Sequence, residues 1–384
     1  MTKKEKFSVL ATPFENWSVR IAAKEETTGL MALLIRGMVI LTALLFSMLI
    51  IFFLGYNPIK AFLAMIKGSF GSVYGLKNTI TVAIPLLIVA VGLTVAFSMK
   101  YWNIGAEGQM VFAAICATGV ARLVPSSVQG AGLILLMILA GMLGGALWAL
   151  IPGIFRAWSG TNETLFTLMM NYLAIKIAVY LRCEIWKDPE AMGFPQIAAI
   201  PDHARLPQIF GVHIGWIIAL IVALLVTIFL RDTKKGYEIR VVGESDRTAQ
   251  YAGMNVSRVI LLGVFISGAI IGLAGVLKLN GVAYTLSEEI GGGNGFTAII
   301  IAWLSQLHIP VMVFVSVLFA AMEQGSLAME LSLGVPASVC QIIEGLILFS
   351  ALSAEFFIRY RIVTERIHKD PDADGCHKMG VGNP

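Results

Sequence analysis

Several carboxylate and amide side chains lie within or beside the long apolar runs of this sequence. Glu107 and Glu344 carry carboxylates, and Asn103, Gln109 and Asn171 carry amides. In hydrocarbon such groups pair with neighbouring helices or line a water-filled route, and a buried carboxylate can also hold a proton or a cation. These positions therefore predict either contacts between helices or the lining of a path through a membrane.

Two short openings combine glycine with polar residues: NIGAEGQ at residues 103–109 and GGGNG at residues 291–295. The glycines of the second opening cannot form a stable helix facing lipid. Residues 288–301 therefore predict a broken or re-entrant segment covered by protein or water, as transport pathways often contain. Asn294 and Phe296, at the start of the helix that follows, join the candidate pathway residues.

The first opening also has a purely structural interpretation. Asn103 is placed to cap the next helix, and Glu107 faces the positive end of that helix dipole. Asn171 lies about two turns into a later helix, where it can join helices or line a path. The sequence leaves both interpretations open.

The sequence lacks the motifs of the common catalytic and metal sites. It contains no GxxxxGK[ST], HExxH or GxSxG pattern and no paired-cysteine metal spacing. The chain is therefore not expected to bind ATP, a metal or another cofactor by itself, or to be an enzyme. No feature points to a nucleic-acid partner.

Composition places these residues in a membrane protein. Hydrophobic residues make up 57% of the chain and charged residues 14%, where a soluble domain carries about 25% charged residues. The apolar residues form runs close to the roughly 20 residues that cross a bilayer. An all-α, polytopic integral membrane protein with about ten transmembrane helices is predicted, and the two similar openings hint at an inverted five-plus-five repeat.

The predicted spans, in chain order, are residues 37–54, 79–97, 108–124, 131–155, 162–181, 214–230, 259–277, 295–304, 311–322 and 336–358. Lys and Arg are concentrated before the first span, between the sixth and seventh, and after the last, so these segments are predicted to be cytoplasmic. Three parts follow: a polar N-terminal segment (1–36), a transmembrane domain (37–358), and a C-terminal tail (359–384) that is expected to be disordered.

The polar, basic island at residues 231–258 separates two apolar runs. Small residues at Ala249, Ala252 and Gly253 would let a short helix lie in a groove of another protein. Arg247 can meet acidic groups there, and Asp246 can cap the short helix. The island is therefore predicted to be a cytoplasmic docking element, with an ordinary basic loop as the alternative.

Four motifs in this order carry a family resemblance: NIGAEGQ, GTNETLFTLMMNY (160–172), VGESDRTAQYAGMNV (242–256) and GGGNGFTAIIIAWLSQLHIP (291–310). Over about residues 37–358 the chain resembles the permease subunits of bacterial ABC importers of the ribose/branched-chain amino acid type. Within that type it is most similar to nucleoside permeases that work with basic-membrane-protein lipoproteins.

The resemblance implies a bacterial plasma-membrane subunit that acts with several partners. They are ABC ATPase subunits that bind the ATP, a second permease, an external substrate-binding lipoprotein and the lipid bilayer. The second permease is often a different homologous chain in this family, and the sequence leaves a second copy of this chain open. The resemblance also implies that residues 231–258 hold the coupling helix, with Gly243, Ala249, Ala252 and Gly253 matching the family pattern. Glu244 and Ser245 depart from it, since Asn-Pro is commoner there, and this leaves the contacts of the helix open.

These observations favour a permease that imports nucleosides with the help of a separate ATPase. A sugar or a branched-chain amino acid remains an alternative substrate. An ion-coupled secondary transporter is an alternative from another class, in which Glu107 and Glu344 would supply the coupling carboxylates.

Overall fold

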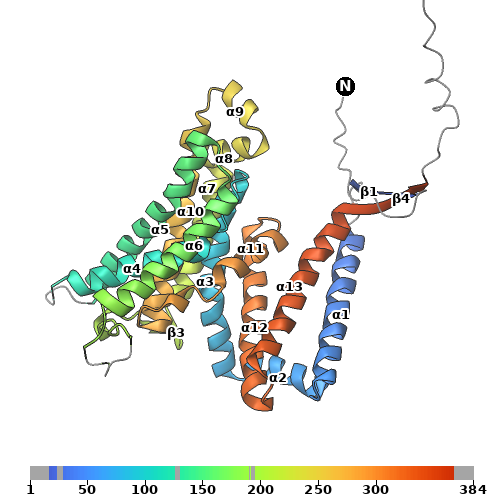
Figure 1. Cartoon of the computed structure of the whole chain (residues 1–384), viewed down its shortest axis with the longest axis horizontal. Coiled ribbons are helices and arrows are strands. Elements are labelled where there is room, and N and C mark those ends of the chain that lie inside the picture. The colour runs from blue at the N-terminus through green and yellow to red at the C-terminus, as the bar shows by residue number, and fades with distance from the viewer. Residues whose placement is uncertain (1–16, 24–28, 126–129, 190, 192–194, 367–384) are drawn as a thin grey trace, which may run out of the picture. The chain divides into compact units, whose positions relative to one another are not determined.

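A computed structural model describes residues 17–23, 29–125, 130–189, 191 and 195–366 of the chain. The chain divides into two compact units, one formed by residues 48–345 and the other by residues 1–47 and 346–384. Most of the described chain is helical, and Figure 1 labels its helices and strands.

Among the described residues, six helices are long and apolar enough to cross a membrane, and one sharply bent pair would make a seventh. The bent pair joins Leu41–Phe53 to Pro58–Phe70 at 116°. The six long helices are Val73–Ser98, Ala131–Ser159, Glu163–Ile185, Gly215–Asp232, Val256–Ala283 and Ile309–Leu333. The chain is therefore a multi-pass membrane protein.

The larger unit is built around α3 (Val73–Ser98), which is buried along most of its length. Packed against α3 are α7 (Gly215–Asp232), α10 (Val256–Lys278), α11 (Asn294–Leu304) and α12 (Ile309–Leu333). Two further helices, α4 (Ala106–Leu123) and α5 (Ala131–Ser159), pack against α10, and α6 (Glu163–Tyr180) packs against α4. Apolar side chains on the outer faces of α5, α6 and α7 stay exposed, as lipid-facing surfaces require.

The sequence did not predict α2 (Pro58–Phe70), which packs against α12 and α3. Asn57 caps it by accepting a hydrogen bond from the backbone N–H of Lys60 at 3.1 Å, and Pro58 occupies the first turn. Both are standard helix-start signals. The helix is only 13 residues long and moderately apolar, so the hydropathy pattern alone did not reveal it.

Two features near the ends of the chain differ from the prediction. The helix predicted from residue 37 belongs to α1 (Gly29–Phe53), which begins within the N-terminal segment that was expected to be only polar. The first part of the tail predicted to be disordered forms β4 (Tyr360–Arg366), which pairs antiparallel with β1 (Trp17–Ala23). The rest of that tail lies outside the described residues. The last helix, α13 (Ala337–Arg359), lies at the predicted place.

Short strands also qualify the all-α prediction within the larger unit. A two-residue hairpin joins β2 (Gln208–Ile209) to β3 (Val212–His213) just before α7. These ladders are small, and the helical class holds. The number of ten spans and the internal repeat stay predictions.

The close contact between α5 and α10 depends on glycines that face each other. A Cβ atom on Gly145 would lie 2.5 Å from the carbonyl oxygen of Gly268 and 2.7 Å from the Cα of Gly272. A Cβ on Gly272 would lie 2.5 Å from the carbonyl oxygen of Gly141. The small-residue spacing that the sequence shows therefore permits direct backbone contact between the two helices.

We expect Gly145→Val to separate α5 from α10 and to lower the free energy of unfolding by about 1–3 kcal/mol, the usual cost of overpacking. Thermal unfolding of the detergent-purified protein measures this. Gly119→Ala in α4 is the matched control, because its Cβ would meet only Trp186 at ordinary contact distances. Equal melting temperatures for the two variants would contradict the packing argument.

Candidate functional site

The carboxylate of Glu107 closes the N-terminus of α11. Glu107 lies in the first turn of α4 and is buried. Its Oε1 accepts a hydrogen bond from the backbone N–H of Gly293 and its Oε2 accepts one from Gly295, both at 2.8 Å. A helix N-terminus presents unpaired N–H groups and positive partial charge, which a carboxylate satisfies. The sequence analysis assigned Glu107 to the dipole of its own helix, and the structure shows that it also serves a helix far along the chain.

Asn171 of α6 forms hydrogen bonds with the backbone at the start of α4. Its Oδ1 accepts from the backbone N–H of Gly108 at 2.8 Å, and its Nδ2 donates to the carbonyl of Ile104 at 2.9 Å. Thr167, one turn earlier, accepts from the backbone N–H of Ile104 at 3.1 Å. These bonds support the helix-joining interpretation of Asn171, because both the oxygen and the nitrogen of its side-chain amide form hydrogen bonds within this chain.

Asn103 does not cap α4, contrary to the prediction. The residue at the cap position of α4 is Gly105, which has no side chain that could accept a capping hydrogen bond. The Oδ1 of Asn103 accepts from the backbone N–H of Gly105 at 2.9 Å and from the Nε2 of Gln109 at 3.2 Å. This local turn shapes the entry to α4.

Lys278 completes the group and was missed as a site residue. It lies just beyond the predicted span 259–277. In the structure it is the last residue of α10, and its Nζ donates to the carbonyl of Gly291 at 3.1 Å. A lone lysine at the end of an apolar span, 13 residues before a glycine run, was the available signal. We call the polar group of Asn103, Glu107, Gln109, Asn171, Lys278 and Asn294 the polar junction. All of its members are buried except Lys278, which is half-buried.

Most of the predicted pathway residues belong to this polar junction. Asn103, Gln109, Asn171 and Asn294 are buried, as Glu107 is, whereas Phe296 is 44% exposed. The side chain of Glu344 lies outside the described part of the structure. The polar junction brings the two glycine-containing openings together, and pathway lining by its members stays a prediction.

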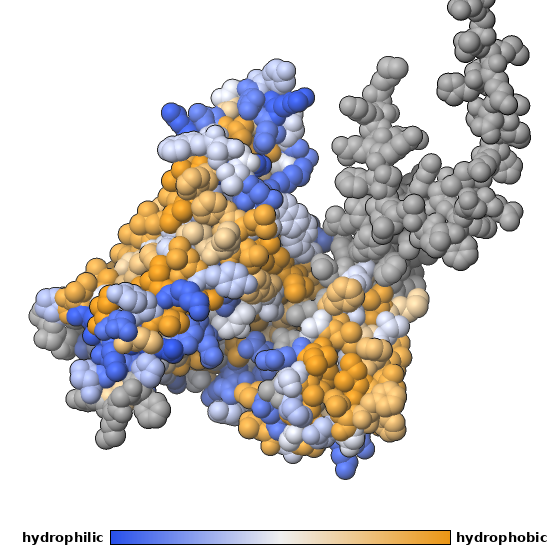
Figure 2. All heavy atoms as spheres, viewed as in Figure 1, coloured by the Kyte–Doolittle hydropathy of each residue, from blue (hydrophilic) through white to orange (hydrophobic). Residues whose placement is uncertain are grey.

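The polar island at residues 231–258 folds into two short helices, α8 (Lys234–Glu244) and α9 (Asp246–Tyr251). They lie at one tip of the larger unit, where Figure 2 shows hydrophilic side chains gathered beyond the apolar helices. Ser245 caps α9 by accepting from the backbone N–H of Thr248 at 3.3 Å. The predicted cap, Asp246, lies instead in the first turn and is exposed.

Gly253 ends α9 in a left-handed conformation with φ of 76°. Its N–H donates to the carbonyl of Gln250 at 2.9 Å, and the N–H of Met254 donates to the carbonyl of Ala249 at 3.0 Å. This pair of bonds is the Schellman arrangement, in which glycine avoids the steric cost of positive φ. The sequence interpreted Gly253 as a contact residue, and the structure gives it a turn-forming role as well.

The residues of α9 divide into an inward and an outward set. Ala249 is fully buried, whereas Tyr251 is 92% exposed. Arg247, Gln250 and Ala252 are also exposed. The outward set offers a cation, an amide and a phenol on one short helix, which is the chemistry of a protein-binding surface.

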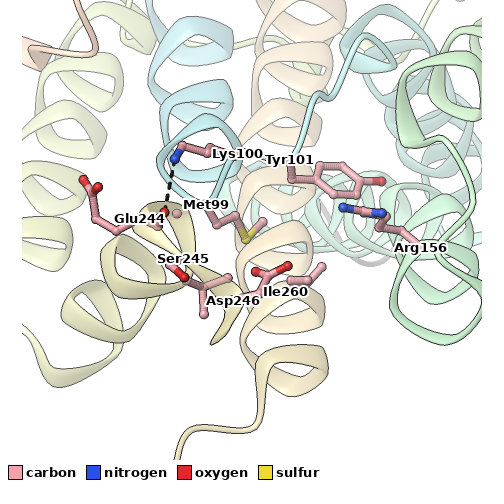
Figure 3. A pocket seen from close by; sticks show the side chains of 10 residues that line it. Met99, Lys100, Tyr101, Arg156, Glu244, Ser245, Asp246 and Ile260 are labelled. Atoms are coloured by element: carbon pink, nitrogen blue, oxygen red, sulfur yellow. Dashed lines mark hydrogen bonds between the residues drawn. The ribbon is translucent and has the colours of Figure 1, made fainter. Parts of the chain in front are cut away.

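Gly243 faces inward, because α8 packs against the end of α3 there. A Cβ on Gly243 would collide with the carbonyl oxygen of Ser98. Lys100 reaches back from the α3–α4 connection, and its Nζ lies 3.4 Å from the carbonyl oxygen of Glu244 (Figure 3). The predicted role of Gly243 in docking is therefore indirect, through the placement of α8.

A pocket of about 270 Å³ lies between these elements, with Tyr101 and Arg156 on one side and Ser245 and Asp246 on the other (Figure 3). Burial, with a smaller contribution from the charge of Glu163, raises the pKa of the Tyr101 hydroxyl above its usual value. The phenol therefore stays neutral at physiological pH. The α3–α4 connection thus contacts α8 at Lys100 and enters the polar junction at Asn103.

Comparison with known proteins gives a consistent result. Residues 75–352 match the family described as branched-chain amino acid transport system permease component. The chain is 31% identical to the glucose ABC transporter permease protein TsgB13 of Haloferax volcanii, over 84% of this chain and 88% of that protein.

Two further relatives carry nucleoside names. The guanosine ABC transporter permease protein NupP of Bacillus subtilis is 30% identical, over 85% of this chain and 95% of that protein. The nucleoside ABC transporter permease protein NupB of Lactococcus lactis is 27% identical, over 83% of this chain and 90% of that protein.

We expect Glu107→Ala to leave two N–H groups of α11 without acceptors and to cost on the order of 3 kcal/mol in the free energy of unfolding. Glu107→Gln should cost less, since its amide oxygen can still accept one bond. The control is Glu289→Ala, which removes an exposed carboxylate near the same glycines. If Glu107→Ala and Glu289→Ala melt at the same temperature, the capping role is wrong.

Proposed function

The chain belongs to the family of branched-chain amino acid transport system permease components, and we propose that it imports a nucleoside. It is the membrane-spanning permease subunit of an ABC importer, and relatives of this kind are not themselves enzymes. The nucleoside assignment is supported by the guanosine and nucleoside relatives, which align over most of both chains. The glucose relative keeps a sugar as the second candidate substrate.

The proposed partners follow from the subunit type. ATP is bound by separate ABC ATPase subunits, a second and different permease chain completes the pathway, and an external lipoprotein delivers the substrate. The basic segments favour a cytoplasmic location for the N-terminus, residues 231–258 and the C-terminal tail of a protein in a bacterial plasma membrane. About ten spans, with α4 and α11 at equivalent places of two inverted halves, fit this orientation. The meeting of the two openings at Glu107 supports that arrangement.

We propose that the ATPase docks on the outward set of α9. The exposed Arg247, Gln250 and Tyr251 would contact it directly, whereas Asp246, Ala249, Ala252 and Gly253 set the shape of the helix and its ends. Movement of α9 and α8 would pass to the α3–α4 connection through Gly243 and Lys100, and from there to the polar junction. The observation that carries this route is the direct contact of α8 with residues 98–100.

An ion-coupled transporter is the less favoured alternative. It requires a carboxylate free to exchange a proton or an ion, but both carboxylate oxygens of Glu107 are occupied by backbone N–H groups. The side chain of Glu344, the other carboxylate that this alternative would use, lies outside the described residues.

The substrate proposal is tested by uptake in proteoliposomes that contain this chain with its ATPase, second permease and lipoprotein. We expect ATP-dependent accumulation of labelled guanosine that is unaffected by excess glucose or leucine. The control is an ATPase subunit unable to hydrolyse ATP, which should abolish uptake. Accumulation of glucose instead of guanosine would assign the chain to sugar import, and uptake without the ATPase would favour ion coupling.

The docking proposal is tested by the affinity of the purified permease for its ATPase. Tyr251→Ala should weaken binding about tenfold, because buried aromatic contacts at interfaces each contribute about 1–3 kcal/mol. The control is Tyr237→Ala, which removes a tyrosine that is 55% exposed on α8. Equal loss in both variants, or loss in neither, would show that α9 is not the docking helix.

A further inference from the structure

The helix α11 is half as long as a membrane span. Its 11 residues extend about 16 Å, roughly half of the 30 Å hydrocarbon core. Its C-terminus leads directly into α12, whose early residue Met312 contacts Thr94 near the α8 end of α3. The helix α11 therefore starts near mid-depth and ends at the level where α8 and α9 attach.

The residues before α11 cannot face lipid. Gly292 and Gly293 are exposed and have positive φ values of 62° and 80°, so this stretch is irregular backbone. Irregular backbone at mid-depth is tolerated only where protein or a water-filled cavity covers it. The exposed face at the start of α11 therefore borders a polar route or a partner subunit.

Aromatic side chains continue this face toward the α8–α9 end. Phe296 is 44% exposed, and Trp303 follows seven residues later, two helical turns along the same face. Trp303 stacks on Trp102 with ring centroids 5.2 Å apart and an interplanar angle of 16°. Phe97 supports the pair at 5.6 Å from Trp303 and 5.9 Å from Trp102.

One indole of the stack is accessible. Trp102 is 46% exposed, whereas Phe97 beside it is almost fully buried. Trp102 also lies in the α3–α4 connection, between Lys100 at α8 and Asn103 at the polar junction. It therefore occupies the segment that would carry movement from α9.

We propose that the exposed indole of Trp102, stacked on Trp303, is a transit site for the planar base of the nucleoside. This inference deepens the proposed function and rests on it. Stacking on an aromatic platform tolerates different bases, because every base has a π-face. The site suits a permease that passes a substrate selected elsewhere.

A belt of aromatic residues at the membrane–water boundary is the competing explanation for Trp102 and Trp303. Such a belt lies on the outer surface of the helices. Trp102 instead follows α3, the helix at the centre of the larger unit, and shares its cluster with the buried Phe97. The position at the end of a central helix favours the transit site.

The test uses the complete importer in proteoliposomes and two readouts, the maximal rate of guanosine uptake and photolabelling of the permease by 8-azidoadenosine. Trp102→Ala should lower both about fivefold or more, the lower end of a single base-stacking contact. Trp102→Phe should keep most of both. Phe314→Ala, at an aromatic position 78% exposed on α12, is the matched control and should behave as wild type.

Competition identifies what the stack holds. Free adenine, and not ribose, should prevent labelling of peptides that contain Trp102 or Trp303. If the wild type imports guanosine but Trp102→Ala matches Phe314→Ala, the transit site is wrong while the nucleoside function stands. If ribose alone prevents labelling, the stack holds the sugar and the inference fails. If the wild type imports no nucleoside, both proposals fail.

Discussion

The fold of the larger unit depends on a single carboxylate that lies at the point where two helices begin. Glu107 opens α4 and, through two hydrogen bonds, also closes the N-terminus of α11. A half-length helix that starts within a bilayer has unpaired N–H groups that no lipid can satisfy. The buried anion at that point makes the interruption stable, and Lys278 and Asn171 hold the backbone on either side of it.

The same junction explains how events at the polar tip can reach the middle of the protein. Between the end of α3 and the start of α4, the chain contacts α8 through Lys100 and then bonds to α6 through Ile104. Close helix contacts at glycines, as between α5 and α10, give the surrounding helices little freedom to absorb a displacement. A shift of α8 would therefore be passed to the polar junction and to the half-length helix α11.

The sequence predicted the positions of the helices better than the contacts between them. Apolar runs located most of the helices, and the polar island at residues 231–258 corresponds to α8 and α9, whose docking role stays a prediction. The polar residues of the junction other than Lys278 were also recognised, but the bonds of Glu107 join positions 186 and 188 residues apart, and local spacing cannot reveal such contacts. The smaller errors have local causes. Ser245 and Asp246 are adjacent and can both cap a helix, so the sequence did not identify which of them caps α9. The helix α2 was missed because its hydropathy is moderate, although Asn57 and Pro58 are signals of a helix start.

The central claim is that the Glu107 carboxylate holds the start of α11 in place. Amide hydrogen exchange of residues 291–297 in the assembled importer, compared between the wild type and Glu107→Ala, tests it most directly. The account predicts slow exchange at Gly293 and Gly295 in the wild type, and a large, local loss of protection in the variant while α3 and α10 stay protected. Unchanged protection at both glycines, or equal loss throughout the helices, would contradict it.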